Sequence, residues 1–218
     1  MKKIVSNLKF NEKNQLVCKG KNGKFCPVFK KQGSLDGACA TYSVIMNLLI
    51  LGVISESDTE LHAKHKTREI KNLFKVFCND HGMHRDGQTF YMIKKMLLNS
   101  FGKVIDVQHT CTKTTNYKTL YTVVSEIDTD KPVIISVYNK DLCHAMLAVG
   151  YEKINDRITR LFCLDPSGDY ILTRKRWNAT IETDEDRRKP FTYKSTIEGV
   201  KDDCSLVRLN DILILSRL

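Results

Sequence analysis

The sequence predicts an α+β protein of one domain over residues 1–218, in which a largely helical half precedes a mostly antiparallel β half. Three observations support this prediction. Apolar residues recur at helical spacing between residues 37 and 101, the spacing changes to that of strands after Gly102, and Asn22-Gly23 separates two short apolar runs. We expect a groove between the two halves.

Residues 1–31 are expected to form an N-terminal hairpin region. The stretch 13–29 alternates between apolar and polar residues and is interrupted by Asn22-Gly23. This dipeptide accepts the positive φ angles that a tight hairpin turn requires, so it is the strongest short-range signal for a hairpin.

Residues 32–102 are expected to form a helical lobe with three helices. The first, over residues 37–51, is apolar almost all round, which is typical of a helix buried at the centre of a domain. The second and third, over residues 59–79 and 89–101, place apolar residues on one face. Each helix is followed by a glycine, which readily adopts the backbone conformation that ends a helix: Gly52, Gly82 and Gly102.

Residues 103–218 are expected to form a β lobe interrupted by one short helix over residues 117–127. Asn155-Asp156 predicts a hairpin turn, and the charged stretch 182–189 is expected to be a loop. The predicted strands cover residues 103–108, 132–138, 144–151, 157–165, 170–177 and 205–215.

The composition is that of an ordinary globular chain with a strong positive charge. Hydrophobic residues at 42% and charged residues at 28% exclude wholesale disorder. The net charge of +10 predicts attraction to an acidic partner. Because the basic residues are spread along the chain, no specific nucleic-acid surface is indicated, and we expect a protein or peptide partner, for which the charge favours an acidic one.

The N-terminus has two lysines but lacks the apolar segment of a signal peptide, and no apolar run approaches the roughly 18 residues of a membrane span. We therefore expect a cytoplasmic protein, or one that a dedicated secretion system exports without a signal peptide. In a reducing compartment the eight cysteines are expected to be thiols, and their irregular spacing does not indicate a disulfide framework.

Cys39 stands at the start of the apolar helix, directly after a turn that contains Asp36 and Gly37. There the backbone N–H groups and the positive end of the helix dipole favour the thiolate, which is the nucleophilic form. Buried cysteines are also common in helix cores. The position of Cys39 alone therefore leaves a reactive and a structural interpretation open.

His144 and Asp165 can complete what a cysteine nucleophile needs, namely a base and a group that orients the base. His144 opens one predicted strand, and Asp165 ends the next, where Pro166 turns the chain out of the sheet. If the two strands pair as a hairpin, His144 and Asp165 become neighbours. The carboxylate would then fix the tautomer of the imidazole and raise its basicity.

Three segments resemble papain-like cysteine peptidases. Residues 32–43 carry a glutamine a few residues before Gly-x-Cys at a helix start, residues 144–151 are His-Ala-Met-Leu-Ala-Val-Gly-Tyr, and residues 164–166 are Leu-Asp-Pro. The chain order Gln, Cys, His, Asp is also that of the family. The resemblance implies a papain-like fold with an active-site groove between a helical lobe and a β lobe.

The same resemblance implies roles for four residues and neither a cofactor nor a metal. Cys39 would be the nucleophile, His144 the base and later the acid, and Asp165 the orienting residue. Gln32 and the Cys39 backbone N–H would form the oxyanion hole.

The sequence departs from plant and lysosomal members at three points. Gln32 precedes Cys39 by seven residues, one more than in those members, and Ala40 replaces the usual aromatic residue after the nucleophile. The third triad position is an aspartate, Asp165, which together with the compact size is similar to bacterial relatives such as the peptidase domains of bacteriocin exporters.

The leading hypothesis is a thiol hydrolase that cleaves peptide or amide bonds through an acyl-enzyme. One alternative uses the same triad in a bacterial effector or toxin for deamidation, transamidation or cell-wall peptide hydrolysis. The other is a catalytically silent papain-like binding module.

Two further motifs compete for a functional interpretation. A group of zinc-binding residue types occurs in the helical region, but its spacing is not a standard one, and solvent-facing histidines are the favoured interpretation: His62, His65, Cys78, His81 and His84. Asn178-Ala179-Thr180 matches a glycosylation sequon, which without export is a chance match.

Overall fold

The computed structural model describes residues 1–33, 37–60, 66–77, 87–111, 116–141, 143–170, 175–183, 193–197 and 204–218. The helices are α1 (Cys39–Ile50), the 3-10 helix η1 (Glu56–Thr59), α2 (Arg68–Lys75), α3 (Phe90–Phe101) and α4 (Asn116–Asp128). The strands are β1 (Lys2–Ile4), β2 (Leu8–Phe10), β3 (Leu16–Lys19), β4 (Phe25–Pro27), β5 (Ile105–Cys111), β6 (Val133–Tyr138), β7 (Cys143–Ile154), β8 (Arg157–Leu164), β9 (Ala179–Thr183), β10 (Tyr193–Ile197) and β11 (Cys204–Arg217).

Six antiparallel strands close into a barrel. They pair in the order β7-β6-β11-β10-β9-β8, and β8 pairs back with β7. The two longest strands, β7 and β11, contain register shifts and pair with different neighbours along their length. These strands therefore also carry the two outer strands, β1 on β7 and β5 on β11.

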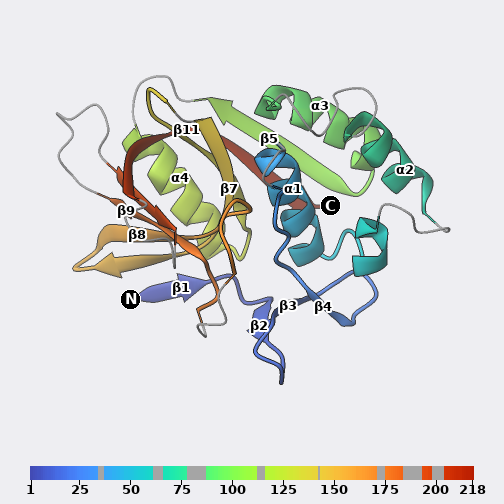
Figure 1. Cartoon of the computed structure of the whole chain (residues 1–218), viewed down its shortest axis with the longest axis horizontal. Helices are drawn as coiled ribbons and strands as arrows, with labels where there is room; N and C mark the ends of the chain where they lie inside the picture. Colours follow the sequence, from blue (N-terminus) through green and yellow to red (C-terminus); the bar gives the residue numbers. More distant parts are fainter. Residues whose placement is uncertain are drawn as a thin grey trace.

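Two hydrophobic clusters cover the two faces of these strands. The first joins α1, α2, α3 and the N-terminal strands to residues such as Ala145, Leu147 and Val149 on one face of β7. The second joins α4 to the alternate residues of β7, including Met146 and Ala148. Figure 1 shows α1 between the barrel and the α2–α3 layer, with α4 on the other side of β7.

Helices α2 and α3 each begin after a threonine that caps the helix. Thr67 precedes α2 and accepts a hydrogen bond from the Ile70 N–H, and Thr89 precedes α3 and accepts one from the Met92 N–H. Helix α1 has no side-chain cap at Ala38, so its first N–H groups stay available to other acceptors.

Strands β2, β3 and β4 form a separate three-stranded antiparallel sheet. The predicted hairpin is confirmed, because β3 and β4 are joined at Asn22-Gly23 and Gly23 has a φ of 72°. The side chain of Asn7 fastens this sheet to the end of α1, since its Nδ2 donates to the carbonyl oxygens of Lys19 (3.2 Å) and Ile50 (2.6 Å).

The predicted fold class, a papain-like helical half followed by a sheet half, is wrong. The chain is mostly β, and in the described part its four α-helices are short, with 8 to 13 residues, while six strands form a closed barrel. Four strands precede α1, whereas the short helix predicted over residues 117–127 is present as α4. Closure depends on β9 and β10, two short strands rich in polar residues that carry little apolar periodicity.

Other element predictions had mixed outcomes. The helix expected over residues 59–79 is represented by α2 alone, with residues 61–65 and 78–79 outside the described residues. Residues 175–177 are not in a strand, contrary to prediction, and the expected loop at 182–189 begins as the end of β9. The five residues of the alternative zinc motif, for which solvent-facing histidines were the favoured interpretation, all lie outside the described residues. Among the helices that the structure describes, none has the length and apolarity to cross a membrane.

Candidate active site

Helix α1 docks onto β7 through two side chains that lie one helical turn apart. The Ala145 N–H donates to the Cys39 Sγ at 3.3 Å, and the Ser43 Oγ donates to the Ala145 carbonyl at 3.5 Å. The N–H and C=O of Ala145 can bond to α1 because β8 does not reach them: the ladder between β7 and β8 stops at the pair Leu147–Leu164. The chain beyond β8 turns away at Pro166, so α1 occupies the edge that a longer β8 would have covered.

The structure brings Cys39, His144 and Asp165 together. His144 is the second residue of β7, and Asp165 follows the last residue of β8. The His144 Nε2 lies 2.7 Å from the Asp165 Oδ1, and the His144 side chain is close enough to the Cys39 thiol to lower its pKa. Since Nε2 faces the carboxylate, Nδ1 is the ring nitrogen left for the sulfur.

The charges of these groups support one another. Burial opposes ionisation of the Cys39 thiol, but its hydrogen bond to His144, the positive charge of His144 and the N–H groups of Ala145 and Ala40 outweigh this effect and lower its pKa below the ordinary value. Burial also opposes the imidazolium, yet Asp165 and Cys39 raise the pKa of His144 to about 10. Both pKa changes therefore favour a thiolate–imidazolium pair over a neutral thiol and imidazole.

Asp165 is almost completely buried, with 1% of its surface exposed. Hydrogen-bond donors around it stabilise the negative charge of its carboxylate. Besides His144, the backbone N–H of Ser167 at 2.8 Å and the Ser167 Oγ at 2.7 Å donate to its Oδ1. Burial raises the pKa of Asp165, but the hydrogen bonds and charge of His144, together with Ser167, bring it below the ordinary value.

Asn178 holds the backbone of Asp165 from both sides. Its Oδ1 accepts from the Asp165 N–H at 2.7 Å, and its Nδ2 donates to the Asp165 carbonyl at 2.8 Å. Its own N–H donates to the Cys163 carbonyl at 3.1 Å. With 1% of its surface exposed, Asn178 is inaccessible to glycosylation in the folded protein, which agrees with a chance sequon match.

Replacing Asn178 by alanine is expected to destabilise the fold by about 1–3 kcal/mol, because it leaves the buried N–H of Asp165 without a partner and removes one of the two donors to its C=O, the other being the Gly168 N–H. The loosened carboxylate should also lower the pKa of His144 from about 10. Urea denaturation and the alkaline limb of the pH–activity profile measure the two effects. Asn178→Asp keeps the acceptor for the Asp165 N–H and should fall between wild type and alanine, whereas an unchanged alkaline limb in both variants would make Asn178 purely structural.

Gln32 lies beside the loop that follows Asp165. Its backbone N–H donates to the Pro166 carbonyl at 2.9 Å, and its side-chain Oε1 is buried without a hydrogen-bond partner among the described residues. Neighbouring contacts hold the same two segments together: Lys31 forms an ion pair with Asp169, and the rings of Phe29 and Tyr170 lie 5.4 Å apart. The segment that leads to α1 is thus attached to the loop that carries Asp165.

The contributions of Ser167 and Asn178 to the site were not predicted from the sequence. Asp165-Pro166-Ser167 contains a signal for Ser167, because a serine two residues after an aspartate commonly hydrogen-bonds its carboxylate in a turn. Cys143, which precedes His144 on β7, is exposed, with its Sγ 3.8 Å from the Ser136 Oγ. The described residues contain no group of three or more His, Cys, Asp or Glu side chains suited to a metal.

Comparison with known families agrees with this chemistry. The model of the Peptidase_C39-like family matches residues 23–187, a span that contains Gln32, Cys39, His144 and Asp165. No curated protein matches the chain. The family match indicates cysteine peptidase activity on a protein or peptide substrate and is consistent with the resemblance to papain-like cysteine peptidases. Because the match covers well over half of the sequence, the chain belongs to the Peptidase_C39-like family.

Proposed function

We propose that this protein hydrolyses a peptide bond through an acyl-enzyme on Cys39, with His144 as base and acid and Asp165 as the orienting carboxylate. The observation that carries the proposal is His144, hydrogen-bonded to the buried Asp165 carboxylate and close enough to the Cys39 thiol to lower its pKa. This arrangement supplies an activated nucleophile and a proton donor in adjacent positions.

In the proposed reaction the Cys39 thiolate attacks the carbonyl carbon of the scissile bond. The carbon–sulfur bond forms as the carbonyl oxygen takes the negative charge, and His144 then gives its proton to the departing amine. In the second half His144 removes a proton from water, and the resulting hydroxide attacks the thioester. Collapse of this intermediate releases the carboxylic acid and restores the thiolate.

The oxyanion is proposed to be stabilised by Gln32 and by the backbone N–H of Cys39 at the uncapped start of α1. The Gln32 side chain has a buried oxygen that no described group uses, and its backbone is attached to the loop after Asp165. An amide held in this way can present a donor with little loss of entropy when the oxyanion forms.

Gln32→Ala is therefore expected to lower kcat by about 10²- to 10³-fold with a small change in KM, because the lost donor acts mainly in the transition state. Steady-state kinetics on a cleaved peptide measure both constants. Gln108→Ala is the matched control, since Gln108 is an exposed glutamine on the outer strand β5. A Gln32→Ala variant with wild-type kcat would remove Gln32 from the oxyanion hole.

Mass spectrometry with a synthetic peptide library tests the proposed reaction class. Peptide hydrolysis yields two fragments whose summed mass exceeds that of the substrate by one water, whereas deamidation leaves one product about one dalton heavier. Iodoacetamide at neutral pH should label Cys39 ahead of the other thiols, because its pKa is lowered while burial raises that of Cys18 and Cys163. Deamidated products without cleavage, or a Cys39 that resists alkylation, would contradict the proposal.

A further inference from the structure

The positive charge of the chain is concentrated at its N-terminus. Residues 1–31 contain nine lysines, one glutamate and no arginine, so this segment carries +8 of the net +10. The basic residues themselves are spread along the chain, but beyond residue 31 nearly equal numbers of acidic residues compensate them. Most of the net positive charge therefore lies in residues 1–31.

The sheet β2–β3–β4 with its two turns, residues 8–27, is here named the basic sheet. It carries five of these lysines and Glu12, which gives +4 of the net +10. One of its faces packs into the core through fully buried residues such as Leu8 and Cys18. On the other face Lys9 and Lys19 stand out with Phe25, which is 57% exposed. The turns add further exposed lysines: Lys13, Lys21 and Lys24.

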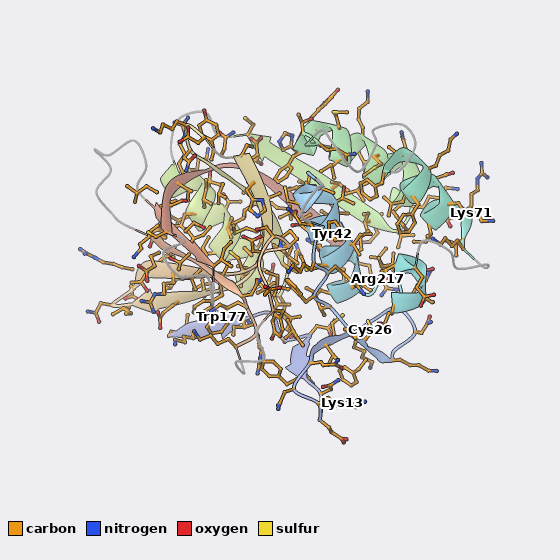
Figure 2. All side chains as sticks on the ribbon, in the orientation of Figure 1. Lys13, Cys26, Tyr42, Lys71, Trp177 and Arg217 are labelled. Carbon is orange, nitrogen blue, oxygen red and sulfur yellow. The ribbon has the colours of Figure 1, made fainter. Side chains whose placement is uncertain are left out.

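The lysines of the basic sheet are not neutralised by close carboxylates, although hydrogen bonds and, to a smaller extent, the charge of Lys21 lower the pKa of Glu69. Lys2, Lys3 and Lys31, outside the sheet, each lie near a carboxylate. In contrast, none of the five lysines of the basic sheet forms an ion pair with any residue that the structure describes. Figure 2 shows Lys13 at the outer tip of the sheet, where its side chain extends away from the rest of the molecule.

The basic sheet stands at a defined distance from the nucleophile. Asn7 links the Lys19 carbonyl to the Ile50 carbonyl at the end of α1, and Cys39 begins the same helix. Twelve helical residues span about 18 Å, which corresponds to about five or six residues of an extended peptide. The segment 28–32 connects the sheet to the site and carries the half-buried Lys30 along the way.

We propose that the basic sheet is an exosite for an acidic segment of the polypeptide substrate, six or more residues from the bond that is cleaved. This inference rests on the proposed function and extends it, because it assigns substrate selection to a surface remote from Cys39. Carboxylates of an extended acidic segment would meet unpaired ammonium groups on a rigid sheet that is anchored in the core. The contact would hold the substrate without taking part in the chemistry, so it would act on KM and leave kcat unchanged.

The composition of the basic sheet favours a polypeptide over a nucleic acid. Arginine, whose planar guanidinium matches phosphate with two hydrogen bonds, is absent from residues 1–31. Single-stranded nucleic acid is bound by several aromatic side chains on which successive bases stack. On the outer face of the basic sheet, Phe25 is the aromatic residue that the structure exposes.

The test compares two internally quenched peptides with the same cleavable sequence. One carries an Asp/Glu-rich tail and the other an Asn/Gln tail. The tail lies six to ten residues from the cleaved bond, and both the N-terminal and the C-terminal placement are tested. The acidic tail is expected to lower KM about tenfold at low ionic strength with kcat unchanged, and 0.5 M salt should abolish the difference. K19E/K21E/K24E should abolish it as well. K95E/K103E/K118E, which reverses three exposed lysines elsewhere, should keep it.

Binding is measured separately on the inactive Cys39→Ala protein, by fluorescence anisotropy of the labelled acidic tail, with an oligonucleotide and phosphatidylserine vesicles as competitors. Equal KM values for both peptides, or tighter binding of the oligonucleotide or the vesicles through the same lysines, would overturn the exosite. If neither peptide is cleaved, the proposed function fails. Loss of tail binding in K19E/K21E/K24E, but not in the control variant, would then still support an acidic polypeptide as the partner of this surface.

Discussion

Replacing Cys39 by alanine is expected to lower the rate of peptide hydrolysis by about 10⁴- to 10⁶-fold, because no other group can form the acyl-enzyme. The substitution removes one sulfur atom at a half-buried position and leaves the docking of α1 through Ser43 and Ala145 in place. The fold should therefore persist, with a thermal midpoint within a few degrees of wild type. Initial rates and a thermal melt measure the two expectations.

Cys143→Ala is the matched control, since Cys143 is an exposed thiol two residues before Ala145 on the same strand. This variant should keep wild-type activity and lose no active-site label. If Cys39→Ala retained activity within tenfold of wild type while Cys143→Ala did not, the nucleophile would have been assigned to the wrong cysteine.

Replacing Asp165 by asparagine is expected to lower kcat/KM by about 10²- to 10⁴-fold and to move its pH dependence. In the wild type the alkaline limb should lie near pH 10, because Asp165 and Cys39 raise the pKa of His144 to about that value. Without the carboxylate this limb should shift toward 6.5, the ordinary pKa of the imidazole. The pKa of the acid limb should rise at the same time, because His144 carries less positive charge and so stabilises the Cys39 thiolate less.

The same substitution should change stability in a defined pH range. The raised pKa of His144 stabilises the native state fully below about 6.5, and this contribution is lost as the pH rises toward 10. The lowered pKa of Asp165 stabilises it above 3.8, and that contribution is lost as the pH falls through the lower native value. The difference in unfolding free energy between wild type and Asp165→Asn should thus be greatest between about pH 4 and 6.5.

Urea denaturation across the pH range measures this difference. Asp169→Asn is the control, because Asp169 is an exposed carboxylate in the same loop whose partner is the surface residue Lys31. It should leave both the stability difference and the activity limbs in place. An alkaline limb that stayed near 10 in Asp165→Asn would show that another group sets the pKa of His144.

Several features of the site could be predicted because they depend on nearby sequence. The start of α1 follows from the change between a small-residue turn and an apolar run, which places Cys39 on the first turn. The proximity of His144 and Asp165 follows from the pairing of two consecutive strands, β7 and β8, joined by a tight turn at Asn155-Asp156. A local hairpin relates two residues without any knowledge of the rest of the sheet.

The barrel could not be predicted in the same way. β9 and β10 have five residues each and few apolar ones, so their periodicity is too weak to mark them as strands. Their pairing depends on partners far away in the sequence, β8 on one side and β11 on the other. The role of Asn178 is hidden for the same reason, because an isolated asparagine before a polar strand has no distinguishing pattern, and its contacts exist only once β9 has paired.

The open edge of β7 has a consequence for the step that ends the proposed cycle. When the acyl-enzyme breaks down, sulfur is the leaving group, and a thiol of lower pKa is expelled faster although it attacks more slowly. The Ala145 N–H, free because β8 stops short of it, donates to that sulfur, so it helps to accept the charge at the moment of departure. Because β8 ends early, the Cys39 sulfur gains a hydrogen-bond donor on β7. In the proposed cycle this makes the thiolate a weaker nucleophile but a better leaving group when the acyl-enzyme is hydrolysed.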